Sequence, residues 1–111
     1  MESKLKLKIL SIEGFIEEVK ANKIDDVRIA CFCRTVPNKE VRSLTYFCVL
    51  VTAARKDGVV IEYEAETGGD ISYFQEQIKE LAEKTDKKKS EIEKQLENAG
   101  IKVKSGRWLN E

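Results

Sequence analysis

Apolar and polar residues follow two different periods in the first part of the chain. Residues 4–9 read Lys-Leu-Lys-Leu-Lys-Ile, a period of two that is typical of a strand with one buried face. Four apolar residues at helical spacing come next: Ile12, Phe15, Ile16 and Val19. Ser11 is a suitable N-cap for that segment, because its hydroxyl can accept a bond from a free backbone N–H. The pattern therefore predicts a strand at residues 4–9 and a helix at residues 12–21.

Three runs with strand periodicity occupy the middle of the chain, at residues 27–34, 43–54 and 59–65. The second run is apolar at both sets of alternate positions, which favours a central strand. A turn is expected at residues 37–40. Lys56-Asp57-Gly58 predicts a tight hairpin between the second and third runs, with a type I′ turn. Together the three runs predict an antiparallel meander.

Helical spacing returns at residues 71–99, with Asp70 as a possible cap, and lapses at residues 85–90, so one helix or two remain open. Gly100 is suited to the left-handed position after a helix, and a last short strand is expected just beyond it. The whole chain, residues 1–111, is predicted to form a single α+β domain in the order β-α-β-β-β-α(α)-β. Its sheet is expected to be mostly antiparallel, with the meander packed by helices on one face.

Composition limits the classes of function. The chain has 111 residues and a formal net charge of zero, so the whole molecule has no long-range attraction for nucleic acid or an anionic membrane. No segment approaches the roughly 20 apolar residues of a membrane helix, and no secretory signal is evident. We therefore expect a cytoplasmic protein without a membrane partner. The many lysines and glutamates, with a single proline, resemble the composition of hyperthermophile proteins.

Histidine is absent, which removes Ser-His and Cys-His catalysis and every imidazole ligand. The three cysteines, Cys31, Cys33 and Cys48, lack the spacing of a zinc or redox motif, and an odd number argues against a disulfide framework. Three thiols could bind zinc together with a carboxylate, but free cysteine usually behaves as a small buried hydrophobe. We expect these residues to pack in the core and expect neither a metal nor a cofactor.

Residues 78–98 resemble a helix-turn-helix motif. Leu81-Ala82, then Thr85-Asp86, then Ile92 match its spacing, although Asp86 stands where glycine is usual. This resemblance implies nucleic-acid binding, for which the basic residues are Lys87, Lys88, Lys89, Lys94, Lys102, Lys104 and Arg107. Interleaved glutamates and the lack of aromatic residues among the lysines favour instead a solvated helix face.

A second alternative rests on carboxylates. Asp57, Glu62 and Glu64 cluster in sequence, and the element order resembles that of restriction-endonuclease-like nucleases. Those enzymes hold Mg²⁺ with an acid on one strand and an acid-x-Lys on the next. The second element here reads Glu62-Tyr63-Glu64 and lacks the lysine, so the alternating glutamates are also consistent with a solvent-facing strand side.

The two-sided apolar character of the meander gives the leading hypothesis. If helices cover one face only, the other face would expose apolar surface, which monomers rarely leave bare. The residues expected at such an interface are Phe32, Leu44, Tyr46, Leu50 and Trp108. The alternative is that the helical region wraps over that face. We therefore expect a non-catalytic binding or assembly module that associates with itself, with the nucleic-acid-binding and nuclease readings as alternatives.

Overall fold

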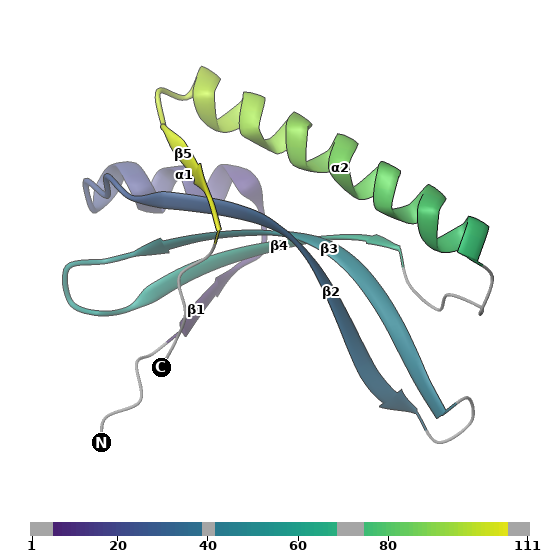
Figure 1. The fold of residues 1–111 in the computed structure, drawn as a ribbon. Coiled ribbons are helices and arrows are strands. Elements are labelled where there is room, and N and C mark those ends of the chain that lie inside the picture. The colour runs from purple at the N-terminus through teal and green to yellow at the C-terminus, as the bar shows by residue number, and fades with distance from the viewer. Residues whose placement is uncertain (1–5, 39–41, 69–74, 107–111) are drawn as a thin grey trace.

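A computed structural model of the chain describes residues 6–38, 42–68 and 75–106 (Figure 1). These residues form five strands and two helices. In chain order the elements are β1 (Lys6–Ile9), α1 (Ile12–Ala21), β2 (Val27–Asn38), β3 (Arg42–Ala54), β4 (Val60–Gly68), α2 (Gln75–Asn98) and β5 (Val103–Ser105). The predicted α+β class is confirmed. Asp70, expected as a helix cap, lies outside the described residues.

All five strands belong to one sheet, in the order β1-β4-β3-β2-β5. The expected meander is present, because β3 pairs antiparallel with both β2 and β4. The two outer strands pair in parallel, β1 with β4 and β5 with β2. The prediction of a mostly antiparallel sheet is therefore wrong, and the sheet is mixed. Parallel strands need a long crossover connection. Here each crossover contains a helix and two strands: α1, β2 and β3 between β1 and β4, and β3, β4 and α2 between β2 and β5.

The hairpin between β3 and β4 has a different turn from the predicted one. The N–H of Gly58 donates to the carbonyl of Arg55 at 3.0 Å, and the N–H of Arg55 donates to the carbonyl of Val59 at 2.8 Å. Gly58 has a φ of 89°, whereas neither Lys56 nor Asp57 has a positive φ. A type I′ turn needs a positive φ at both central residues, so this connection is a three-residue loop in which glycine alone takes the left-handed position.

Helix α2 runs without a break from Gln75 to Asn98, which contradicts the turn that a helix-turn-helix would need at Thr85-Asp86. Thr85 is 1% exposed and takes a core position that an apolar residue would otherwise fill. Its hydroxyl donates to the carbonyl of Leu81 at 2.7 Å and lies 2.6 Å from the hydroxyl of Thr67 on β4. The lapse in apolar spacing therefore marks a polar contact with the sheet, while the helix itself continues.

The two helices end in the same way. In α1 the N–H of Ile24 donates to the carbonyl of Val19 at 3.0 Å; in α2 the N–H of Ile101 donates to the carbonyl of Leu96 at 2.9 Å. Both are Schellman ends, in which the residue before the donor is left-handed. That residue is Gly100 in α2 (φ 83°) and Lys23 in α1 (φ 52°). The predicted stop at Gly100 is confirmed, and the start of α1 is also as expected, since Ser11 accepts a bond from the N–H of Gly14 at 3.0 Å.

The hydrophobic core lies between the helices and one face of the sheet. Both helices cover the same face (Figure 1). From the sheet this core takes Val49, Val51 and Ala53, each 0% exposed, and from the helices it takes Phe15 and Leu96, also 0% exposed. Apolar residues at alternate strand positions and at helical spacing thus meet as the sequence predicts.

The hairpin of β2 and β3 extends beyond the rest of the sheet. β4 pairs with β3 only as far as Phe47, whereas β2 and β3 remain paired out to Asn38 and Arg42. Pro37 lies in this pairing, opposite Ser43, so the turn expected at residues 37–40 begins later than predicted. We call the two-stranded extension, residues 34–38 and 42–46, the arm. It bends away from α2 (Figure 1).

Candidate functional site

A row of polar and charged residues crosses all five strands on the face opposite the helices. Register places these residues side by side in the order Lys8, Glu62, Thr52, Arg28 and Lys104. Thr52 is 0% exposed and Glu62 is 8% exposed, although neither helix covers this face. The row therefore combines buried polar groups in the middle of the sheet with charged residues at both edges.

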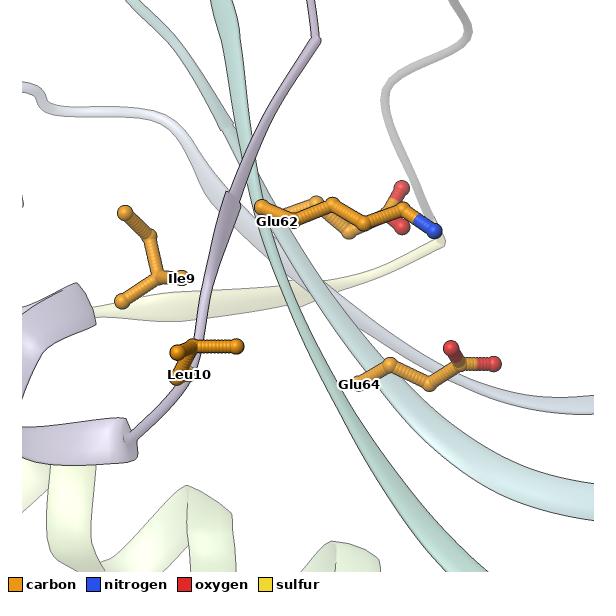
Figure 2. A pocket seen from close by; sticks show the side chains of 5 residues that line it. Ile9, Leu10, Glu62 and Glu64 are labelled. Atoms are coloured by element: carbon orange, nitrogen blue, oxygen red, sulfur yellow. The ribbon is translucent and has the colours of Figure 1, made fainter.

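A small hollow of about 160 Å³ lies between β1 and β4, next to Glu62 and Glu64. Both glutamates extend from β4 to the same side of the sheet, and Ile9 of β1 extends to the opposite side (Figure 2). The carboxylate of Glu62 forms an ion pair with Lys6 at 3.3 Å. Sequence reasoning missed the lysines of β1 because nothing local in the chain indicates that β1 pairs with β4.

Asp57 does not join the two glutamates. Its carboxylate accepts hydrogen bonds from the side chain of Arg55 and, at 3.2 Å, from the backbone N–H of Val59. Bonding to Arg55 and to Val59 lowers the pKa of the Asp57 carboxyl. Asp57 thus belongs to the hairpin turn. Among the residues that the structure describes, no group of three or more Cys, Asp and Glu side chains is arranged to hold a metal ion.

The basic residues expected to contact nucleic acid do not form one group, because some are in ion pairs and others lie on different parts of the chain. Lys88 lies 3.9 Å from Glu91, and Lys89 lies 3.7 Å from Glu93, as intrahelical pairs. Lys87 and Lys94 are exposed on α2, Lys102 lies just after the end of that helix, and Lys104 lies on β5. Arg107 lies outside the described residues. The structure thus pairs two of these residues with carboxylates and distributes the other described ones over α2, the segment after it and β5.

The cysteines differ from one another, contrary to the expectation of a common role in the core. Cys48 is 1% exposed and donates to the carbonyl of Phe32 at 3.6 Å, on the face away from the helices. Cys31 is exposed, and its thiol donates to the carboxylate of Asp86 on α2 at 3.5 Å. Cys48 is therefore buried as predicted, but on the face of the sheet opposite the helix-covered core. The prediction is wrong for Cys31, because α2 presents a carboxylate at that point of the sheet. The side chain of Cys33 is outside the described part.

The expected interface residues are only partly described. Leu50 is 5% exposed and Phe32 is half-buried, so neither forms the open apolar surface that the alternation suggested. Register places Leu44 opposite Val36 on the arm, and Tyr46 opposite Arg34. Trp108 lies outside the described residues. Within them, the large apolar residues with substantial exposure are Leu7 (39%) and Leu10 (96%).

The outer edge of β2 is a feature that sequence reasoning did not identify. β5 pairs with β2 only at residues 27–29, and the N–H of Gly106 donates to the carbonyl of Ile29 at 2.9 Å. Ile29 therefore points its backbone groups away from β3. Because alternate residues of a strand point the same way, Cys31, Cys33 and Thr35 direct their N–H and C=O groups to this outer side.

Pro37 continues that alternation with a carbonyl but no N–H. A proline is tolerated in a strand where its nitrogen faces away from the ladder, so its position agrees with the outward direction deduced from Ile29. In the described part of the chain no strand pairs with β2 beyond Ile29 or with β3 before Phe47. Within the described residues, both outer edges of the arm are therefore without a partner strand. On β2 this open edge continues back from the arm to Cys31, next to the end of the β5 pairing at Ile29.

Comparison with models of known protein families, with curated proteins and with solved structures gives no match for this chain. Among the described helices, none has both the length and the apolar character needed to cross a membrane. The class of protein is thus defined by the fold itself, an α+β domain with a mixed five-stranded sheet and a projecting arm.

Proposed function

We propose that this protein is a binding and assembly module that forms a homodimer through its arm. The observation that carries the proposal is the continuation of β2 and β3 past the end of β4, where no strand of the described part of the chain pairs with either outer edge. A two-stranded ribbon is at best marginally stable by itself in water, and exposed strand edges are templates for pairing with another chain.

The bounds of the β2 edge favour a second copy as the occupant. Along this edge Cys31, Cys33 and Thr35 direct their N–H and C=O groups outward, and the edge is bounded by β5 at Ile29 and by Pro37. An antiparallel pair of identical edges related by a two-fold axis uses this segment in both copies. Such pairing occupies the β2 edge of both copies, so a third copy cannot add at that edge, which supports a dimer.

Proline substitutions test the edge. Thr35 and Thr45 lie directly opposite each other, so both direct their backbone groups outward, Thr35 from β2 and Thr45 from β3. Thr35→Pro removes the outward N–H of the β2 edge without removing a bond between β2 and β3. Thr45→Pro makes the matched change on the other edge.

Sedimentation velocity at micromolar concentration provides the measurement. The unmodified protein is expected to be a dimer, Thr35→Pro a folded monomer, and Thr45→Pro a dimer. Circular dichroism confirms that both variants keep their secondary structure. A protein that is monomeric throughout the micromolar range contradicts the proposal. If Thr45→Pro alone dissociates the dimer, the contact lies on the β3 edge, and the proposed β2 contact is contradicted.

A further inference from the structure

Independently of the arm, we propose that residues 107–111 cross the sheet as a strap on the face opposite the helices, with the indole ring of Trp108 packed on Leu50. We call this face the open face, because neither helix lies on it (Figure 1). Residues 107–111 are outside the described residues. The low exposure of the open face and the point where the chain leaves β5 both support this arrangement.

The middle of the open face is closed to solvent. On the central strand β3, Thr52 is 0% exposed, Cys48 is 1% exposed and Leu50 is 5% exposed. Near the two edges of the same face, Lys8 on β1 and Lys104 on β5 are exposed. A cover that lies over the central strand and leaves both edges accessible accounts for this difference.

The neighbouring side chains do not supply this cover for Leu50. Its nearest neighbours on the open face, along β3 and across to β2 and β4, are Cys48, Thr52, Ala30 and Glu64. The first three are shorter than leucine, so the end of the Leu50 side chain projects beyond them. The longer neighbours, Glu64 and the diagonal Phe32, flank Leu50 and are themselves half-buried. An additional group above Leu50 accounts for its low exposure.

The chain leaves β5 at the level of Leu50. The N–H of Gly106 donates to the carbonyl of Ile29 at 2.9 Å, and Ile29 pairs with Val51, the residue next to Leu50 on β3. Gly106 has a φ of 116°, which other residues rarely adopt, so the chain can turn here out of the direction of β5. On the helix side of the sheet, Ile29 and Val51 are already covered by the core. The open face is therefore the side that a turning chain can cover.

The length and composition of residues 107–111 suit this path. Adjacent strands are about 4.8 Å apart, so β3 lies about 10 Å from β5, with β2 between them. Trp108 is the second residue after Gly106, and extended residues advance by about 3.4 Å each, so its long side chain can reach Leu50. An indole ring buries roughly 150–250 Å² of surface, and the small side chain of Ala30 leaves room for it beside Leu50.

A strap in this place determines which surface of the protein is accessible. With Trp108 seated on the sheet, Leu50 and Phe32 are withheld from other molecules. With the strap displaced, the same residues form an apolar patch, which is the kind of surface that binds protein partners. Residues 107–111 therefore act as the internal occupant of a face that would otherwise associate with another chain.

Fluorescence of the full chain tests the strap directly, because Trp108 is the single tryptophan. We expect the folded protein to emit at shorter wavelength than the protein unfolded in urea, and acrylamide to quench the folded protein several-fold less. Both values should stay constant when the protein is diluted from the micromolar to the nanomolar range, since the cover belongs to the same chain.

Leu50→Ala and Val51→Ala form a matched pair, because these neighbours on β3 face opposite sides of the sheet. Leu50→Ala should shift the emission to longer wavelength and strengthen quenching. Val51→Ala, at a core position, should leave both values unchanged, with circular dichroism confirming that each variant is folded.

Three results overturn the proposal. The first is quenching that is as strong in the folded, unmodified protein as in urea, because Trp108 is then exposed. The second is quenching that strengthens on dilution, because a second copy then covers the ring. The third is a response to Val51→Ala that equals or exceeds the response to Leu50→Ala, because the ring then lies elsewhere than on Leu50.

Discussion

Lys23 and Gly100 occupy equivalent left-handed positions at the ends of α1 and α2, with φ values of 52° and 83°. Glycine adopts this conformation readily, whereas for other L-residues it costs roughly 1–2 kcal/mol. We expect Lys23→Gly to raise the free energy of unfolding by about 0.5–1 kcal/mol, after the entropy that glycine adds to the unfolded chain. Urea unfolding provides the measurement, and a loss of stability would contradict the strain assigned to Lys23.

The reverse change at the other helix should destabilise. Gly100→Ala places a Cβ at a position with no neighbouring heavy atom within 4 Å, so the backbone alone determines the cost. We expect the free energy of unfolding to fall by about 1 kcal/mol, again by urea unfolding. An unchanged value would mean that the helix end adjusts to another conformation without cost.

The hydroxyls of Thr67 and Thr85 have only two protons for three contacts. Thr67 donates to the carbonyl of Phe47 at 3.2 Å, Thr85 donates to that of Leu81 at 2.7 Å, and their own oxygens are 2.6 Å apart. The carbonyl of Leu81 lies within a helix, whereas Phe47 lies where the β3–β4 register shifts, so its carbonyl depends more on the side-chain donor. We expect Thr67→Val to lower stability by about 1–2 kcal/mol and Thr85→Val by less than about 1 kcal/mol. Thermal unfolding of both variants checks this order, and the opposite order would contradict it.

Cys31 is expected to react slowly for an exposed thiol. Partial burial raises the pKa of the Cys31 thiol, and its hydrogen bond to the Asp86 carboxylate raises it further. In a background with Cys33→Ser and Cys48→Ser, the rate of alkylation by iodoacetamide should therefore reach half its maximum at a higher pH than for free cysteine. Asp86→Asn should lower that midpoint, and Lys89→Gln should raise it, because Lys89 opposes the shift. Equal midpoints in all three proteins would contradict the assignment.

The turn residue Asp57 makes stability depend on pH. The hydrogen bonds from Arg55 and from the N–H of Val59 lower the pKa of Asp57 in the folded state. A carboxyl with a lowered folded pKa contributes stability above its unfolded pKa and loses it as the pH falls through the folded value. Asp57→Asn should therefore be less stable than the unmodified protein at neutral pH, and the difference should close below the ordinary range of aspartate. Urea unfolding at a series of pH values measures the difference in free energy of unfolding between the two proteins. A difference that does not change with pH would contradict a role for the titration of the Asp57 carboxyl.

The local elements could be predicted because neighbouring residues determine them. Ser11 and the apolar spacing after it define α1, and Gly100 marks the end of the second helix. Pairing between distant segments left no local pattern, so the parallel partners of β1 and β5 were missed. The alternation of residues 4–9 indicates that one face is buried but not which strand lies beside it.

The candidate site was harder to predict for the same reason. Glu62 and Glu64 share a face because they alternate along one strand, but their lysine neighbours come from β1 through a pairing of distant segments. Among the described residues, the open edge of β2 depends on where β5 stops and that of β3 on where β4 stops, and the composition of β2 and β3 records neither. The apolar spacing of α2 lapses at Thr85, which we interpreted as a turn. In the structure Thr85 is a buried position of a continuous helix, where its hydroxyl contacts that of Thr67.

The parallel pairing of β5 with β2 has a consequence for biosynthesis. Val27 pairs with Val103, so a strand that is synthesised about 75 residues later shields the start of β2. Until residues 103–105 have been synthesised, the nascent meander carries the segment of its β2 edge that β5 later occupies without that partner. A chain stalled before residue 103 would keep that edge open, and an open edge is the route by which incomplete sheets aggregate.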